Sequence, residues 1–126
     1  MKIRSKRDIG ALGEDIAAKF LKKEKYKIID RNYYCKYGEV DIIASDNGVI
    51  AFIEVKSRKD GTSVNPLYSV NIRKQKQIMK AAQDYIIRKK LKDKMFRFDV
   101  LTVIFKEDAP EVSLIKNAFE YMELNE

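Results

Sequence analysis

The chain has 126 residues, a length that fits one domain with a single modest core. It carries 26 Lys and Arg against 19 Asp and Glu; the formal net charge of +7 favours a polyanionic partner such as nucleic acid, although lysine-rich surfaces also serve solubility alone. With no histidine and one cysteine, Cys35, the sequence excludes Ser-His-Asp triads, histidine or cysteine metal clusters and an intrachain disulfide, so any hydrolytic chemistry must come from carboxylates, lysines and a hard metal ion.

The first half of the chain predicts one helix and three strands. Apolar residues recur at helical spacing between residues 7 and 25, which indicates a helix there. Aromatic and β-branched residues predict strands over residues 26–34, 39–45 and 49–56. Asn47-Gly48 lies between the last two strands, and this dipeptide is the strongest short hairpin signal that a sequence offers.

The second half predicts a loop, a helix and two strands. Gly61, Asn65 and Pro66 lie among small polar residues and indicate a loop over residues 57–69. The remaining predicted elements are a helix over residues 72–91, a strand over 97–105 and a short final strand over 112–115. No repeat or linker interrupts this order, so we expect residues 1–126 to form a single α/β domain.

The sequence indicates neither a membrane-bound nor a secreted protein. No apolar run is long enough to span a bilayer. The basic N-terminus, Met1 to Arg7, is not followed by the apolar core of a signal peptide. We therefore expect a cytoplasmic location, with no membrane contact and no disulfide-linked partner.

A two-residue turn at Asn47-Gly48 would set the pairing of the strands that it joins. Asp41 then pairs with Glu54 across the hairpin, and Lys56 falls on the same face. Directly opposed β-carbons lie about 4.5–5.5 Å apart, so the two carboxylates repel each other unless a divalent cation lies between them. Mg²⁺ suits such a site, because it binds one or two carboxylates and keeps several waters. A three-residue loop would instead send the two carboxylates to opposite faces.

An exposed cross-strand salt bridge is the other interpretation of Glu54-Val55-Lys56, because Glu-x-Lys is common in strands. Asp41 in register with Glu54 weighs against it, since a salt bridge does not account for two opposed acids. We therefore expect a metal site at these two carboxylates.

Several motifs of the chain match those of a known family. Asp41 followed by a hairpin and Glu54-Val55-Lys56 resembles the PD-(D/E)xK nuclease signature. Over nearly the whole chain the ordered set of motifs resembles the YraN family of bacterial proteins, which is similar to archaeal Holliday-junction resolvases; the matching segments are Gly10 to Glu14, Arg31-Asn32, Gly38 to Asp41, Phe52 to Arg58, Lys74, Arg97 to Val100 and Asn117 to Phe119. The resemblance implies a single nuclease-like domain with a restriction-endonuclease-like α/β fold, in which helices flank a central mixed sheet of about five strands.

The resemblance also implies a role for individual residues. Asp41 and Glu54 would be the metal-binding carboxylates, with the backbone carbonyl of Val55 as a further ligand. Lys56 would orient or activate the attacking water, and Glu14 would be the acid of the first helix that supports the metal from the opposite side. A surface glutamate is the other interpretation of Glu14. The proline of the signature is replaced by Val40, at a position that varies widely in this fold.

Three basic residues are candidates for contact with nucleic acid. Arg73 and Lys74 lie at the start of the second predicted helix, where the helix N-terminus and the cations would attract a phosphate backbone. The resemblance assigns substrate contact to Lys74, whereas Lys76 and Lys80 fit a solvated helix face better. Arg58 follows the site and would either clamp a phosphate or be solvated.

Two further patterns are interpreted as structural. Arg97 and Asp99 are two residues apart in a strand, which predicts an ion pair at the edge of the core. Tyr33, Tyr34 and Tyr37 fit the surface of a sheet better than a base-stacking role, so we assign them no function.

Two functions of different classes follow from these features. The first is a Mg²⁺- or Mn²⁺-dependent endonuclease that hydrolyses phosphodiester bonds in DNA, branched DNA included. The resemblance to junction-cutting enzymes, which act as dimers, also implies a homodimer, and the sequence does not show which surface would pair. The second is a non-catalytic nucleic-acid-binding adaptor that keeps the nuclease fold. The basic charge supports the adaptor, and the intact set of Asp41, Glu54 and Lys56 opposes it.

Overall fold

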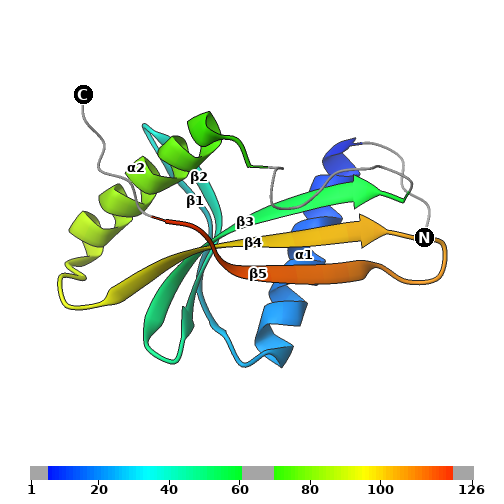
Figure 1. Cartoon of the computed structure of the whole chain (residues 1–126), viewed down its shortest axis with the longest axis horizontal. Coiled ribbons are helices and arrows are strands. Elements are labelled where there is room, and N and C mark those ends of the chain that lie inside the picture. The colour runs from blue at the N-terminus through cyan, green and yellow to red at the C-terminus, as the bar shows by residue number, and fades with distance from the viewer. Residues whose placement is uncertain (1–5, 61–69, 121–126) are drawn as a thin grey trace.

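A five-stranded mixed sheet with one helix on each face forms the part of the chain that the computed structural model describes, residues 6–60 and 70–120 (Figure 1). The elements in chain order are α1 (Lys6–Lys23), β1 (Lys27–Cys35), β2 (Gly38–Asp46), β3 (Val49–Lys59), α2 (Ile72–Lys89), β4 (Met95–Phe105) and β5 (Glu111–Phe119). Neither of these helices combines the length and the apolarity that crossing a bilayer requires.

The topology of the sheet confirms the predicted fold class. The strands lie side by side in the order β1-β2-β3-β4-β5, and each neighbouring pair is antiparallel except β3–β4, which is parallel. A parallel pair needs a long crossover connection, and α2 lies within that connection. The result is a mixed α/β sheet of the restriction-endonuclease-like type.

The central strand β3 alternates its side chains between two cores, one under each helix. Ala51 and Ile53 are buried with residues of α1, whereas Ile50 and Phe52 are buried with residues of α2. A strand covered on both faces carries a nearly continuous apolar run, and residues 49–53 form such a run. The two helices are therefore fixed on opposite faces of the same strand.

The helix α2 is capped at both ends. The Asn71 side chain accepts the backbone N–H of Lys74 at 2.9 Å, which satisfies one of the free donors of the first helical turn. At the other end Lys90 adopts the left-handed conformation, with φ of 55°. The predicted helix over residues 72–91 is confirmed, and it ends two residues earlier, at Lys89.

The hairpin between β2 and β3 has the predicted two-residue turn. Asn47 and Gly48 both have positive φ, 51° and 86°, as a type I′ turn requires. The strands pair in the predicted register from Asp46↔Val49 to Ile42↔Ile53.

Two predicted strands were too short. β3 continues past Lys56 to Lys59, because it pairs in parallel with β4 along its whole length. β5 extends over Glu111–Phe119 instead of residues 112–115, and pairs with the edge of β4. Backbone pairing extends both strands through polar segments that carry no apolar pattern. The part of the predicted loop at residues 61–69 lies outside the described residues.

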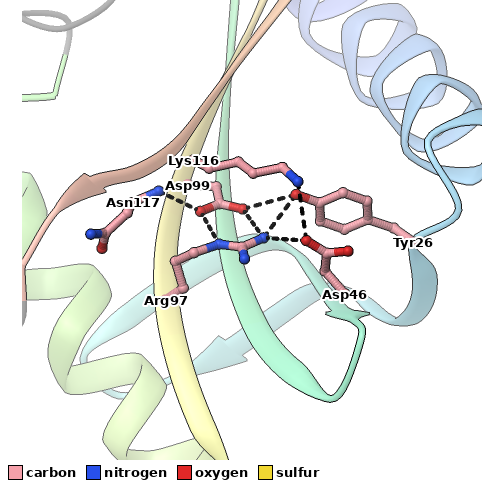
Figure 2. A network of polar contacts seen from close by, with 6 residues as sticks. All are labelled: Tyr26, Asp46, Arg97, Asp99, Lys116 and Asn117. Atoms are coloured by element: carbon pink, nitrogen blue, oxygen red, sulfur yellow. Dashed lines mark hydrogen bonds and ion pairs between the residues drawn. The ribbon is translucent and has the colours of Figure 1, made fainter.

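A network of ion pairs and hydrogen bonds joins the segment between α1 and β1 to β2, β4 and β5 near the hairpin turn (Figure 2). The wholly buried Asp99 accepts hydrogen bonds of 2.8 and 3.0 Å from the Arg97 guanidinium, which confirms the predicted ion pair. The same guanidinium donates to Tyr26 Oη at 2.8 Å and to Asp46 Oδ2 at 3.0 Å. Lys116 Nζ lies 3.2 Å from the same Asp46 oxygen. Each carboxylate of this network therefore has a cationic partner.

Asp99 also compensates for an irregularity in the sheet. The β4–β5 register shifts between Phe98 and Val100, and Asn117 on the opposite strand has φ of 53°. The Asn117 N–H donates to Asp99 Oδ1 at 2.9 Å. The carboxylate thus accepts a hydrogen bond that a regular ladder would give to a backbone carbonyl.

Candidate metal centre

A cleft with a volume of about 810 Å³ lies at the end of β3 farthest from the hairpin turn. Its walls come from α1, β2 and β3, and six of the predicted site residues line it: Glu14, Asp41, Glu54, Val55, Lys56 and Arg58. The structure thus brings together residues that are up to about forty positions apart in the chain, and it leaves Arg73 and Lys74 on the neighbouring helix α2.

Glu14 reaches the cleft because α1 approaches β3 closely at Gly13. A β-carbon added to Gly13 would lie 1.8 Å from Ser57 Oγ and 3.0 Å from Ser57 Cβ. Any larger residue would therefore push the helix and the strand apart. This contact holds Glu14, the next residue of α1, against the cleft.

Asp41 lies where the β2–β3 ladder ends. Ile42 is the last ladder residue of β2, so Asp41 and Glu54 are not the backbone pair that the sequence predicted. Asp41 Oδ2 instead accepts the backbone N–H of Val55 at 2.8 Å. The alternation of side chains along β2 breaks at the same point, because Val40 packs in the core under α2 and Ile42 in the core under α1. The two carboxyl groups nevertheless interact, because burial and then the charge of Asp41 raise the pKa of Glu54.

Three carboxylates converge at the edge of the cleft, and two of them, Glu14 and Asp41, line it. The carboxylate oxygens of Glu14, Glu39 and Asp41 all lie within 4.8 Å of one another. The Asn32 amide lies between two of them and, with its nitrogen turned toward them, donates to Glu14 Oε1 at 2.8 Å and to Glu39 Oε1 at 2.9 Å. Burial, followed by the charge of Asp41, raises the pKa of both glutamates. We refer to Glu14, Glu39, Asp41 and Glu54 as the carboxylate cluster.

Glu39 was missed as a site residue by the sequence analysis. It lies two positions before Asp41 in the same strand, and this spacing was the available signal. Spacing alone could not select it, because its neighbours Glu14 and Asn32 come from α1 and β1 and are brought in by packing.

Glu54 is buried, with 6% of the residue exposed. Burial, then the charge of Asp41 and the hydrogen bond with it, raise the pKa of Glu54 to about 8, against the opposing charges of Lys74 and Lys56. Lys74 Nζ lies 3.9 Å from Glu54 Oε2, at the limit of an ion pair. Without an added cation, the surroundings of Glu54 therefore favour the protonated form of its carboxyl group.

The four predicted basic residues differ in their placement. Lys56 is half-buried in the cleft, and Arg58 is half-buried beside it, with Nη1 donating to the Ser57 carbonyl at 2.9 Å. Lys74 lies over Glu54, whereas Arg73 is exposed on the first turn of α2. Three of the four are thus near the carboxylate cluster.

The donor set of the carboxylate cluster has a definite chemical preference. Carboxylate and carbonyl oxygens are the ligands of hard cations such as Mg²⁺ and Mn²⁺. A cation here would favour the ionised form of Glu54 and offset the repulsion among the acids. The residues present therefore fit a divalent metal ion.

Comparisons with known proteins agree with the motifs of the chain. The family described as "Uncharacterised protein family UPF0102" matches residues 13–103, a range that contains the carboxylate cluster. The chain is 50% identical over 116 residues to a UPF0102 protein of Clostridium kluyveri, an alignment that covers 90% of this chain and 95% of the relative. It is 48% identical over 117 residues to a UPF0102 protein of Clostridium botulinum and 46% identical over 116 residues to one of Clostridium tetani, with the same coverage of 90% and 95% in both. The chain therefore belongs to the UPF0102 family, which is the YraN family that its motifs resembled.

Proposed function

We propose that the chain is a Mg²⁺- or Mn²⁺-dependent endonuclease that hydrolyses phosphodiester bonds in DNA, with branched DNA among its substrates. The observation that carries the proposal is the carboxylate cluster: three of its members have oxygens within 4.8 Å of one another, and the pKa of the fourth, Glu54, is raised to about 8. Such a group is costly to a folded protein unless a cation joins it. The proposal includes a cytoplasmic location, where DNA is an available polyanion and Cys35 stays reduced.

Asp41, Glu54 and the backbone carbonyl of Val55 would hold the ion. Glu14 of α1 and Glu39 of β2 would support it, since their carboxylate oxygens lie within 4.8 Å of those of Asp41. When bound, the ion supplies Lewis-acid polarisation of the phosphoryl group and a lower pKa for a nearby water. The cluster's own contribution is to keep its carboxylates in place before the substrate arrives.

Lys56 would orient the attacking water or stabilise the charge that develops on the phosphate. It is half-buried in the same cleft, and its charge lies near enough to lower the pKa of Glu54. A half-buried ammonium group is screened less by solvent than an exposed one, so its effect on the reacting phosphate is larger.

Arg58 and Lys74 would bind the phosphates on either side of the scissile bond. Arg58 lines the cleft, and Lys74 lies 3.9 Å from Glu54 on the opposite side. Arg73 is one residue from Lys74, exposed at the N-terminus of α2, where the helix dipole and the free N–H groups also attract a phosphate. These contacts would position the DNA backbone without selecting its sequence.

The test is cleavage of labelled linear, nicked and four-way-junction DNA by the purified full-length chain, with Mg²⁺, with Mn²⁺ and with EDTA. We expect metal-dependent cleavage that falls by about two orders of magnitude in Glu54→Gln and in Asp41→Asn, the effect of removing one group that stabilises a transition state. Glu24→Gln, which changes an exposed acid just after α1, should cleave like the wild type. Undiminished cleavage by Glu54→Ala would show that the assignment is wrong.

A non-catalytic nucleic-acid-binding adaptor is the second candidate, and the position of Lys74 favours it. Its ammonium group is 3.9 Å from Glu54, so the protein supplies part of the balancing charge itself. Calorimetric titration with Mg²⁺ discriminates between the two candidates. An adaptor shows no metal binding that depends on Asp41, whereas the nuclease loses its metal binding in Asp41→Asn.

A further inference from the structure

The tip of the β1–β2 hairpin presents aromatic rings at the rim of the carboxylate cluster. Tyr34 is 70% exposed and Tyr37 is 38% exposed. Tyr34 is the cross-strand partner of Glu39, and the charge of Glu39 raises the pKa of the Tyr34 hydroxyl. Because Glu39 belongs to the carboxylate cluster, its cross-strand neighbour Tyr34 places an exposed ring beside the candidate metal centre.

Cations from two elements surround the second ring. Lys36 Nζ lies 5.1 Å and Lys80 Nζ 6.0 Å from the centroid of Tyr37. The hairpin tip rests on α2, since a β-carbon added to Gly38 would lie 3.9 Å from Gln77 Cβ. The tip and this part of α2 therefore form one surface of aromatic rings and ammonium groups, which lies next to the carboxylate cluster because Tyr34 pairs with Glu39.

We propose that this surface, formed by Tyr34, Lys36, Tyr37 and Lys80, binds an unpaired nucleotide of DNA beside the phosphodiester bond that is cut. The inference rests on the proposed function and names its substrate class: DNA in which a duplex meets an unpaired strand, as at ends, flaps and junctions. From the sequence, Tyr34 and Tyr37 had been interpreted as part of a sheet surface and Lys80 as part of a solvated helix face.

The chemistry of the surface favours an unpaired base over a duplex. A tyrosine ring stacks on a base only where the face of that base is free, and within a duplex both faces are covered by neighbouring bases. The lysines would bind the phosphates of the same strand. A surface for duplex DNA alone would need the cations and would gain nothing from a ring that is 70% exposed.

The spacing between the rings and the carboxylate cluster suits this arrangement. Opposed residues of neighbouring strands lie about 4.5–5.5 Å apart, and successive stacked bases about 3.4 Å apart. A base stacked on Tyr34 would therefore lie roughly one or two nucleotides from a phosphate held at Asp41. The ring would select the substrate, and the carboxylate cluster would act on the adjacent bond.

The experiment measures binding of the full-length chain, in EDTA so that no cleavage occurs, to two fluorescent DNA probes. One probe is a blunt duplex, and the other is the same duplex with a single-stranded overhang that carries 2-aminopurine, whose fluorescence is quenched on stacking. The variants are Tyr34→Ala, Tyr34→Phe and Lys36→Gln. Ile29→Ala is the matched control, because Ile29 is also exposed on β1, at 43%, and lies away from the hairpin tip.

We expect the wild type to prefer the overhang probe and to quench its 2-aminopurine. Tyr34→Ala should lose about tenfold in affinity for that probe and lose the quenching, while its affinity for the blunt duplex stays within about twofold. Tyr34→Phe, which keeps the ring, should behave like the wild type, as should Ile29→Ala. Lys36→Gln should weaken both probes alike, because it removes a phosphate contact.

Failure of this inference is distinguishable from failure of the proposed function. Equal binding of the two probes by the wild type, or an overhang preference that survives in Tyr34→Ala, would overturn the inference and leave a duplex-cutting nuclease. A wild-type chain that neither binds nor cuts any DNA would overturn both proposals.

Discussion

At the turn end of β2, Asp46 lies in a network with Asp99 in which both carboxylates bind the Arg97 guanidinium, at 3.0 Å and 2.8 Å. Toward the other end of the same strand, the carboxylates of Glu39 and Asp41 meet that of Glu14 within 4.8 Å. Both groups hold acids that the fold has brought together. They differ in the cations that accompany them.

The pKa values of the two groups record this difference. Burial pushes the pKa of Asp46 upward, but hydrogen bonds from Arg97 and Lys116 outweigh burial and lower the pKa. Burial has the same direction at Glu54, where the neighbouring Asp41 adds to it and raises the pKa to about 8. Acids matched by the protein's own cations stabilise the fold, whereas acids left in excess form a site that an external cation can complete.

The largest expected effect is the loss of the balanced network. Asp99→Ala leaves the Arg97 guanidinium without its buried partner, so the free energy of unfolding should fall by about 3–5 kcal/mol. Urea denaturation at neutral pH measures this fall in the free energy of unfolding. Asp108→Ala, at an exposed acid of the β4–β5 turn, should change stability by less than about 0.5 kcal/mol. If Asp99→Ala lowered the free energy of unfolding no more than Asp108→Ala, the Arg97 network would not stabilise the fold.

Removing an acid from the carboxylate cluster should instead increase the free energy of unfolding of the metal-free chain. A pKa of Glu54 raised from 4.5 to about 8 means that the folded chain holds a proton which the unfolded chain has released in that range. Metal-free stability should therefore fall as the pH rises from about 5 to 8. Glu54→Gln removes this titration and should raise the free energy of unfolding at pH 8 by roughly 4 kcal/mol, because each pKa unit corresponds to about 1.4 kcal/mol.

Urea denaturation in EDTA at pH 5 and pH 8 measures this gain, which should be small at pH 5, where the wild-type carboxyl group is already protonated. Glu24→Gln should follow the wild-type pH profile. Destabilisation of Glu54→Gln at pH 8 would mean that the cluster is balanced after all.

Metal binding should depend on the same proton. Because a ligand carboxylate must lose its proton to bind a cation, the affinity for Mg²⁺ should rise about tenfold per pH unit up to a pH near 8. Calorimetry at pH 6, 7 and 8, in buffers of different ionisation enthalpy, measures both the affinity and the proton released. Equal affinity at pH 6 and pH 8 would exclude Glu54 as a ligand.

The smallest expected effect lies at the rim of the balanced network. The Lys116 side chain is 55% exposed and lies 3.2 Å from Asp46, which keeps its bond to Arg97. Lys116→Met should therefore cost less than about 1 kcal/mol in the free energy of unfolding, as exposed ion pairs usually do. A loss as large as that of Asp99→Ala would show that the network depends on its exposed rim.

The local chemistry of the chain was enough to predict much of this structure. Asn47-Gly48 tolerates positive φ at both positions, so the type I′ turn and the β2–β3 register could be read before the fold was known. The helical periodicity, the family motifs and the Arg97–Asp99 pair were likewise within reach, because each depends on neighbours in sequence.

The prediction was incomplete where distant segments meet. The register of the hairpin placed Asp41 opposite Glu54, but the ladder ends at Ile42 and Asp41 binds the Val55 N–H instead. Glu39 was not predicted as a site residue. The predicted β3 and β5 were too short, because pairing with β4 extends both strands.

By itself, the sequence determined the fold class, the family, the hairpin turn and most of the residues that line the cleft. These follow from periodicity, backbone preference and ordered motifs, all of which act over short distances along the chain. Only the tertiary structure decided the balance of charge at each group of acids, that is, which acids are paired with the protein's own cations and which are left in excess. That balance depends on Gly13 bringing α1 against β3, on Asn32 lying between two glutamates and on Arg97 being at one end of the sheet and not the other. Electrostatic energy depends on distance in space and on burial, and neither is encoded in the spacing of residues along the chain.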